Sequence, residues 1–293
     1  SVKLLLILIF PLLGFLAFAG VYVTGKYHTL TEMDRTVTAS GTAQKISAVV
    51  TSLQRERGAS GVFIGSGGTS MRDALSQFRI DSDTTIKALR SLSTEASAEL
   101  IEVLGGLDEI ATLRQQVDAQ SINSGESGAR YTRLIGSLIG YTHSLEARVS
   151  DPRILRALGA LNQFVEMKER AGRERALLGL AFSQKQLNAD LLARLSRNLG
   201  EFAAYQDAFQ RRATADFKNK LDSALQQSAS QAASNLQRAA METALGETLD
   251  TQPEEWFKLS TNRIDLMVQV ERALGQNVAD LATRARDEAA QSL

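Results

Sequence analysis

The protein has 293 residues, of which 33 are basic and 33 acidic, with three prolines, two histidines and no cysteine. The balanced charge argues against a general nucleic-acid-binding protein, which would carry a basic excess, and the absence of cysteine excludes disulfides and thiol chemistry. His28 and His143 are too few and too isolated for a histidine-based metal site, so we expect neither a metal nor a cofactor.

The first predicted element is an apolar helix near the N-terminus. Leu4 to Gly25 carries no charge, and its roughly 22 residues are enough to cross a ~30 Å hydrocarbon core. A cleaved signal peptide is the alternative, because Ala17-Phe18-Ala19 resembles a small-x-small cleavage site. We expect an uncleaved transmembrane helix, because the apolar run continues directly into a helical pattern. Residues 1–26 then form a cytoplasmic start and a membrane helix, and residues 27–293 form an extracytoplasmic domain.

The rest of the chain is predicted to form consecutive helices. Few prolines and many Ala, Leu, Gln, Arg and Glu favour helix throughout, and no segment shows the alternation typical of a strand. Gly65–Ser70 and Ser121–Gly128 break the pattern, Ser70 can cap the helix that follows it, and Asp151-Pro152 is a strong start signal. We therefore expect helices up to about residue 64 and then over about 71–104, 107–120, 129–149, 152–184, 188–228, 225–245 and 253–293.

The first and last predicted helices indicate how the chain is organised. The first leaves the membrane, and the last, ~60 Å long at 1.5 Å per residue, can return to it. We expect an all-α fold, in which an N-terminal transmembrane helix is followed by long up-and-down helical bundles. We also expect a second transmembrane helix and a cytoplasmic output module beyond Leu293.

Three arginines lie where helices are expected to bury apolar side chains. Each belongs to a stripe of residues three or four positions apart, which share one helix face. The stripes are Ile46, Val49, Leu53, Arg57 and Ile64; Ile154, Leu158, Leu161, Val165, Lys168, Gly172, Arg175, Gly179 and Phe182; and Trp256, Leu259, Arg263, Met267, Val270, Leu274, Val278 and Leu281. A buried guanidinium is costly unless a negative group meets it. Because no acidic residue shares these stripes, we infer that Arg57, Arg175 and Arg263 meet a bound anion.

The alternative is that these arginines extend to solvent or pair with acids at the helix edges. Glu56 and Glu174 directly precede two of them, but successive helical residues project about 100° apart, so these acids point off the stripes. Lys168 either joins the site or lines its rim. Gly58 and Gly172 flank the arginines, and glycine inside a helix costs about 1 kcal/mol relative to alanine. They allow either close helix packing or room for a ligand.

Arginine suits a small, flat oxyanion. Its guanidinium is planar and permanently charged, and it donates paired hydrogen bonds. An anion that binds best when the arginines converge would draw their helices together, and binding would then act as a switch.

Three segments around these arginines together resemble one known family. Leu53-Gln54-Arg55-Glu56-Arg57-Gly58, Lys168-Glu169-Arg170-Ala171-Gly172-Arg173-Glu174-Arg175-Ala176, and Trp256-Phe257 with Thr261-Asn262-Arg263-Ile264-Asp265 are similar, in order and spacing, to the motifs of the NIT domain. This is the nitrate- and nitrite-sensing domain of bacterial receptors. The resemblance covers about residues 40–275.

The resemblance implies an all-helical sensor of paired four-helix bundles that holds nitrate or nitrite between helices. It assigns the ligand to Arg57, Arg175 and Arg263, with Arg55, Lys168, Gly58 and Gly172 as weaker candidates. It also implies a receptor in the bacterial inner membrane with its sensor domain in the periplasm or outside. We favour a homodimeric methyl-accepting chemotaxis protein, which would act on cytoplasmic signalling proteins and would not contact nucleic acid.

Two other functions compete with this interpretation. A similar bundle could recognise another ligand, such as a carboxylate or a partner protein, or the helices could form a structural spacer. An enzyme is not expected, because the sequence has no Ser/His/Asp set, metal cluster or phosphate-binding loop.

Overall fold

The computed structural model describes residues 2–92 and 97–291, with side chains from residue 13 onward, and its described part is almost entirely helical. The predicted all-helical bundle is confirmed. The helices are α1 (Val2–Gly65), α2 (Arg72–Arg90), α3 (Ala98–Gly106), α4 (Glu109–Asp118), α5 (Ser124–Glu146), α6 (Pro152–Ser183), α7 (Ala189–Arg212), α8 (Ala215–Gln226), α9 (Ser228–Glu242) and α10 (Pro253–Gln291).

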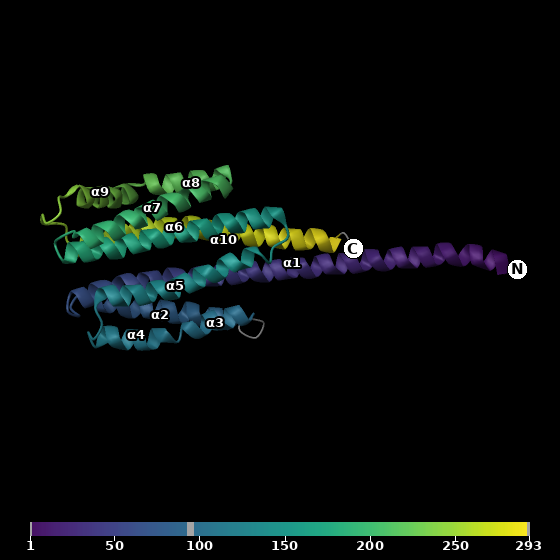
Figure 1. Ribbon diagram of the computed structural model, residues 1–293, viewed down its shortest axis with the longest axis horizontal. Helices are drawn as coiled ribbons and strands as arrows, with labels where there is room; N and C mark the ends of the chain where they lie inside the picture. Colours follow the sequence, from purple (N-terminus) through teal and green to yellow (C-terminus); the bar gives the residue numbers. More distant parts are fainter. Residues whose placement is uncertain (1, 93–96, 292–293) are drawn as a thin grey trace.

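The helices form two bundles that lie side by side (Figure 1). The first contains the bundle part of α1 with α2, α5 and the end-to-end pair α3–α4; the second contains α6, α7, α10 and the end-to-end pair α8–α9. Each bundle is thus a four-helix bundle in which one position is taken by two shorter helices placed end to end. The bundles meet where α1 and α5 pack against α6 and α10, and α1 and α6 run in the same direction.

Helix α6 lies at the centre of the molecule, and its side chains are therefore buried on nearly every face of the helix. It contacts α1, α5, α7 and α10, and from Leu158 to Arg175 most of its residues are buried on all sides. One hydrophobic core runs through both bundles, with Phe164 of α6 in edge contact with Phe209 of α7 at 5.3 Å between ring centroids. A smaller core surrounds Trp256 at the far end of the second bundle.

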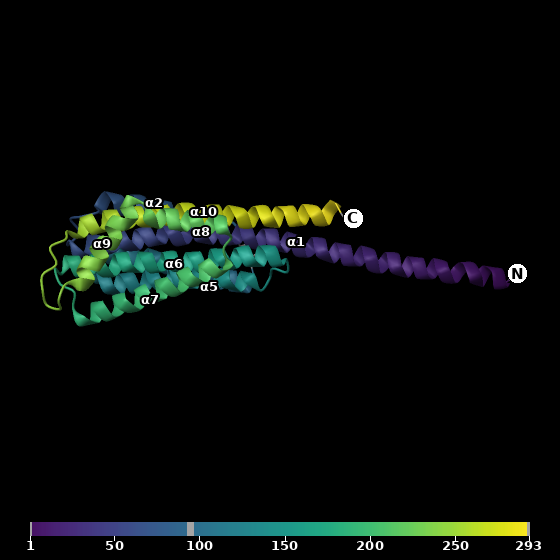
Figure 2. The same ribbon diagram turned by 90° about the horizontal axis from the view of Figure 1, so that it is seen from above.

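The predicted N-terminal transmembrane helix is corrected by the structure. Among the described residues, no helix combines the length and the apolar character that crossing a membrane requires. The first part of the predicted span, up to residue 12, lies outside the residues whose side chains are described. Helix α1 itself extends well beyond the bundles toward the N-terminus, whereas α10 ends beside it (Figures 1 and 2).

Several predicted helix boundaries also need correction. The helix predicted over 71–104 ends at Arg90, and the one predicted over 188–228 ends at Arg212, where the extended backbone of Ala213 stops it. Met71, with a left-handed backbone at φ 66°, occupies the N-cap position of α2 in place of Ser70. The predicted cap of α6 is confirmed, since Asp151 Oδ1 accepts hydrogen bonds from the next backbone amides, at 2.7 Å from Arg153.

Candidate functional site

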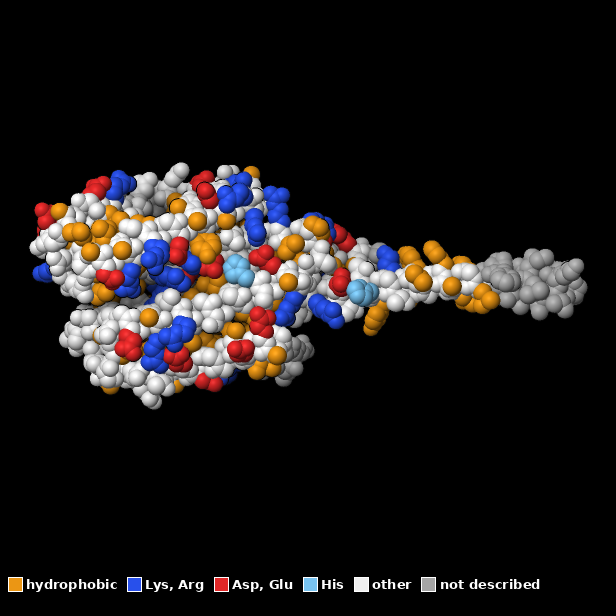
Figure 3. Space-filling model, in the orientation of Figure 1, with side chains coloured by type: hydrophobic (Ala, Val, Ile, Leu, Met, Phe, Trp, Pro, Cys, Tyr) orange, Lys and Arg blue, Asp and Glu red, His pale blue; other side chains and the backbone are white. Residues whose placement is uncertain are grey.

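A cavity of about 430 Å³ lies between the two bundles. Five helices line it, α1 and α5 from the first bundle and α6, α7 and α10 from the second. On the face in Figure 3, Lys and Arg side chains gather along the boundary between the bundles. The lining residues that carry polar or charged side chains are Arg57, Ser124, Thr132, Arg173, Arg175, Ser183, Arg194, Arg197, Asn198 and Glu201.

Arg57 of α1 reaches the cavity wall as half of a buried ion pair. Its Nη1 lies 2.7 Å from Oε1 of Glu169, its Nη2 lies 3.1 Å from Oε2, and Nη1 also donates to Thr132 Oγ1 at 2.8 Å. Both side chains are almost fully buried, with 2% of Arg57 and 0% of Glu169 exposed. The predicted anion partner of Arg57 is therefore already present as a carboxylate of the protein.

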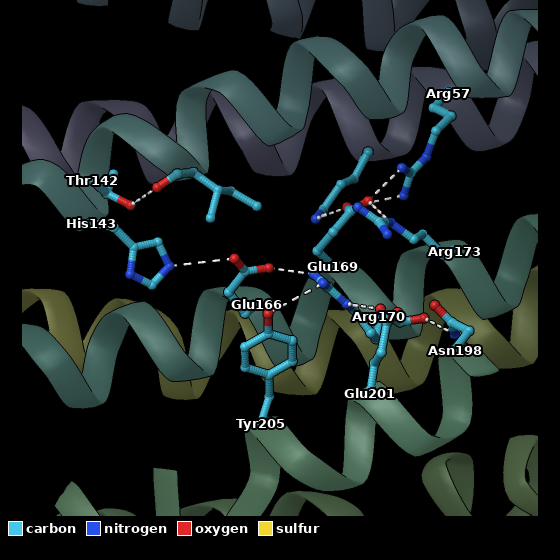
Figure 4. A network of polar contacts seen from close by, with 12 residues as sticks. Arg57, Thr142, His143, Glu166, Glu169, Arg170, Arg173, Asn198, Glu201 and Tyr205 are labelled. Atoms are coloured by element: carbon cyan, nitrogen blue, oxygen red, sulfur yellow. Dashed lines mark hydrogen bonds and ion pairs between the residues drawn. The ribbon is translucent and has the colours of Figure 1, made fainter. Parts of the chain in front are cut away.

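Glu169 is a strongly held carboxylate (Figure 4). In addition to Arg57, it accepts hydrogen bonds from Arg173 Nε and Gln54 Nε2, each at 2.8 Å. Burial acts to raise the pKa of Glu169, but the charges and hydrogen bonds of Arg57 and Arg173 outweigh burial and lower it to about 2. The side chain is thus ionised at neutral pH.

Arg175 of α6 is equally buried but has no such partner. Its Nη1 donates to Thr261 Oγ1 and its Nη2 to the backbone oxygen of Gln54, both at 2.8 Å, and its guanidinium lies over the Phe257 ring at 4.9 Å. Within the described part of the chain, no carboxylate lies within ion-pair distance of it. Burial and then the charge of Arg57 lower the pKa of Arg175 to about 9. It is a desolvated cation without a counter-charge.

Two glycines allow the arginines to cross between the bundles. A Cβ on Gly58 of α1 would lie 3.0 Å from Arg175 Nη2, and a Cβ on Gly172 of α6 would lie 2.8 Å from Arg57 Nη2. Each arginine thus packs over the glycine of the opposite helix. The glycines permit both close packing and placement of the guanidinium groups, the two uses that the sequence left open.

The remaining predicted site residues lie away from this cavity. Arg263 pairs with Glu174 at 2.8 Å, and both are buried. Lys168 is fully buried, contacts the Glu271 carboxylate and donates to Thr51 Oγ1 at 2.6 Å. Arg55 pairs with Asp265 at 2.6 Å and is partly exposed. The structure therefore brings together Arg57, Arg175, Gly58 and Gly172, whereas Arg263, Lys168 and Arg55 each have an acidic partner elsewhere.

The stripes do not reveal these acids, because a stripe corresponds to a single buried face on each helix. Glu169 and Glu174 fall off the stripe of α6, but α6 is buried on nearly all sides, so residues off the stripe are also in the interior. As predicted, neither Glu56 nor Glu174 pairs with the arginine that follows it in the sequence, but Glu174 pairs with Arg263 of another stripe, which the sequence offered only as the alternative. Glu56 pairs with Arg114 of α4 at 2.7 Å. The alternation of acidic and basic residues in the second motif was the available signal for buried pairing.

A second polar network fixes the other side of α6 (Figure 4). Arg170 contacts Glu166, donates to Glu201 Oε2 at 2.9 Å and lies over the Tyr205 ring at 4.6 Å. His143 Nε2 of α5 lies 3.3 Å from Glu166. Hydrogen bonds with Glu146 and then Glu166 raise the pKa of His143 to about 9. These contacts hold α6 against α5 and α7, so Arg175 extends from a firmly anchored helix.

Comparisons with known proteins agree on the family. The profile of the NIT family, described as nitrate and nitrite sensing, matches residues 48–279. The nitrate regulatory protein of Klebsiella oxytoca is 30% identical over 245 residues, which are 79% of this chain and 60% of that protein. The solved structure of the NasR transcription antiterminator, 22% identical, superposes with a TM-score of 0.83 over 94% of this chain and 81% of that one. That likeness shows the fold. The chain belongs to the nitrate and nitrite sensing family.

Proposed function

We propose that this member of the nitrate and nitrite sensing family binds its anion in the cavity between the bundles, with Arg175 and Arg57 as the principal contacts. The observation that carries the proposal is Arg175, a buried cation that faces the cavity and has no carboxylate within ion-pair distance among the described residues. Such a charge is costly in an empty site, and a bound anion offsets that cost.

The hydrogen-bonding capacity of the two arginines supports a planar oxyanion. In both side chains Nε is buried and has no hydrogen-bond partner among the described atoms. In Arg57, Nη1 and Nη2 both donate to Glu169, so the Nε–H group is the donor that is left for a ligand. Nitrate and nitrite have oxygens in one plane that can accept such paired bonds, and the Phe257 ring offers an apolar surface beside Arg175.

We assign the other predicted residues to support of the fold. Arg263, Lys168 and Arg55 are already neutralised by Glu174, Glu271 and Asp265. A ligand would have to displace one of these acids, whereas at Arg175 it displaces none. Gly58 and Gly172 act by giving the two guanidinium groups space.

The sensing step follows from the placement of the arginines on two bundles. A ligand shared by Arg57 of α1 and Arg175 of α6 links one helix of each bundle, so it favours the arrangement in which these helices approach.

The chain spans about 60% of the curated relative's length. The relatives are named a regulatory protein and a transcription antiterminator, and we therefore propose a gene-regulatory output carried by a further region in place of a chemotactic one. A homodimer, an extracytoplasmic location and the lack of nucleic-acid contact stay predictions.

Calorimetric titration of the full chain with nitrate, nitrite, chloride and sulfate tests this proposal. Saturable binding of nitrate or nitrite should disappear in Arg175→Met, which should keep its helical circular dichroism spectrum. Arg211→Met is the matched control, because Arg211 is an exposed arginine of α7 outside the cavity. Equal binding by Arg175→Met and the unaltered protein would overturn the proposed site.

A further inference from the structure

We propose that Glu169 restricts the cavity to anions of a single charge. This inference rests on the proposed function, because it concerns the same arginines, and it adds a residue that sets which anions the site accepts. Glu169 is not a ligand contact in this proposal. It fixes the charge that remains for the ligand to neutralise.

The buried charges of the site leave one positive charge uncompensated. Arg57 and Arg175 contribute two cations, and Glu169 contributes one anion; all three are at least nine-tenths buried. Arg173 also touches Glu169, but its side chain is 31% exposed, so solvent screens it. The other charged residues that line the cavity, Arg194, Arg197 and Glu201, are more exposed still and are screened in the same way. The other buried cations next to the site, Arg263 and Lys168, are paired. One monovalent anion therefore completes the neutralisation.

A divalent anion would meet two penalties in this cavity. It would leave a net negative charge among buried groups, where desolvation makes an unpaired charge expensive. It would also share Arg57 with the Glu169 carboxylate, and the repulsion between two anions on one guanidinium doubles with the charge of the ligand. Sulfate and nitrate are both small oxyanions, so size alone does not separate them in a cavity of about 430 Å³.

The negative charge of Glu169 stays in place, because its carboxylate neither takes up a proton nor rotates away from the site. Four hydrogen bonds from Arg57, Arg173 and Gln54 hold both carboxylate oxygens. The lowered pKa of Glu169 keeps it ionised throughout the physiological range. Its charge is a fixed part of the site, as the two cations are.

A purely structural role is the competing explanation, since Glu169 of α6 ties Arg57 of α1 across the bundle interface. The two explanations differ in one measurable quantity. Loss of a structural tie weakens all anions alike, whereas loss of the charge changes the ratio of sulfate to nitrate affinity.

The test is anion titration of the full chain and of Glu169→Gln, with sulfate and nitrate measured separately. The substitution keeps the shape and one acceptor oxygen, and Gln54 Oε1, which is buried without a partner among the described atoms, can accept from the new amide. We expect the ratio of sulfate to nitrate affinity to rise at least tenfold. Glu174→Gln is the matched control, because Glu174 is an equally buried acid of α6 whose arginine lies outside the cavity; its ratio should change less than threefold.

The double variant Arg57→Gln with Glu169→Gln protects the test against a folding defect. It removes one charge of each sign, so Arg175 again supplies one net positive charge. Anion affinity should fall, but sulfate should stay excluded. A ratio that is unchanged in Glu169→Gln, or raised equally in the double variant, would overturn the proposal.

The result also separates this inference from the proposed function. If the unaltered chain binds no nitrate or nitrite, the proposed function fails, but sulfate binding gained by Glu169→Gln alone would still support the charge restriction. If the unaltered chain binds nitrate and Glu169→Gln keeps the same selectivity, only the further inference fails.

Discussion

Replacement of Arg175 by methionine should stabilise the ligand-free protein, although it removes a fully buried side chain that makes two hydrogen bonds. The pKa of Arg175 falls well below its ordinary value, to about 9, and one pKa unit corresponds to ~1.4 kcal/mol, so holding its charge in the interior beside Arg57 costs the fold roughly 5 kcal/mol. Methionine loses the bonds to Thr261 and Gln54, worth about 1.5 kcal/mol each because the donor is charged, and the contact with Phe257, worth about 1 kcal/mol. The free energy of unfolding should therefore rise by about 1 kcal/mol.

The same substitution at Arg263 should have the opposite sign. Arg263 neutralises Glu174, whose side chain is 2% exposed. Its removal leaves a buried carboxylate without a partner, which destabilises by about 3–5 kcal/mol. Two buried arginines of the same family motifs thus differ in their effect on stability, because one has an internal counter-ion and the other has not.

Urea unfolding in nitrate-free buffer, followed by circular dichroism, gives both values. A repeat at a nitrate concentration about 100 times the dissociation constant should add about 2.7 kcal/mol to the unaltered protein and nothing to Arg175→Met. Easier unfolding of Arg175→Met than of the unaltered protein in nitrate-free buffer would refute an uncompensated charge at Arg175. Full stabilisation of that variant by nitrate would refute its role as the principal ligand contact.

Further predictions concern pH and the glycines. The folded pKa of Glu169 lies below its ordinary value of 4.5, so its stabilisation is present above pH 4.5 and is lost as the pH falls toward 2; acid urea titrations should show roughly 3 kcal/mol of this dependence, absent in Glu169→Gln. His143 has a raised pKa, so it stabilises below pH 6.5 and loses the effect as the pH rises through 9; the stability gap between His143→Gln and the unaltered protein should therefore be present at pH 6 and gone at pH 10. Gly172→Ala should weaken nitrate binding at least tenfold by displacing Arg57, whereas Gly200→Ala, which meets open space, should leave binding intact and stabilise by about 1 kcal/mol. Equal binding by the two glycine variants would contradict the packing argument.

Local sequence signals predicted the helical class and several of its boundaries. Asp151-Pro152 starts α6 as expected, because an N-cap and a proline act within a few residues of chain. The end of α7 was missed, since the chain leaves helix at Ala213 and Thr214 without glycine or proline. After the break, α8 packs against α10, and no local sequence signal marks this contact between distant segments.

The site was predicted in part for a related reason. The spacing of apolar residues points to Arg57 and Arg175, because an arginine on an apolar stripe is conspicuous in any helix. The spacing does not distinguish these two arginines from Arg263. The counter-ion of Arg263 is Glu174, which lies on α6 as Arg175 does but faces α10. The decisive fact, which arginine lacks a carboxylate, depends on how α6 is rotated between its four neighbours. The packing of neighbouring helices determines this rotation of α6, and the residue spacing within a single helix does not reveal it.

The near-equivalent placement of the two cavity arginines explains how one ion can affect both bundles. Arg57 lies about two turns before the end of α1 at Gly65, and Arg175 lies about two turns before the end of α6 at Ser183. The helices are parallel, so the arginines meet at one level from opposite sides. Glu169 neutralises only the first of them. In the proposed binding mode, the free energy of anion binding therefore arises mainly at α6, while its geometric effect falls on the contact between α6 and α1. That contact is the junction through which one bundle can move relative to the other.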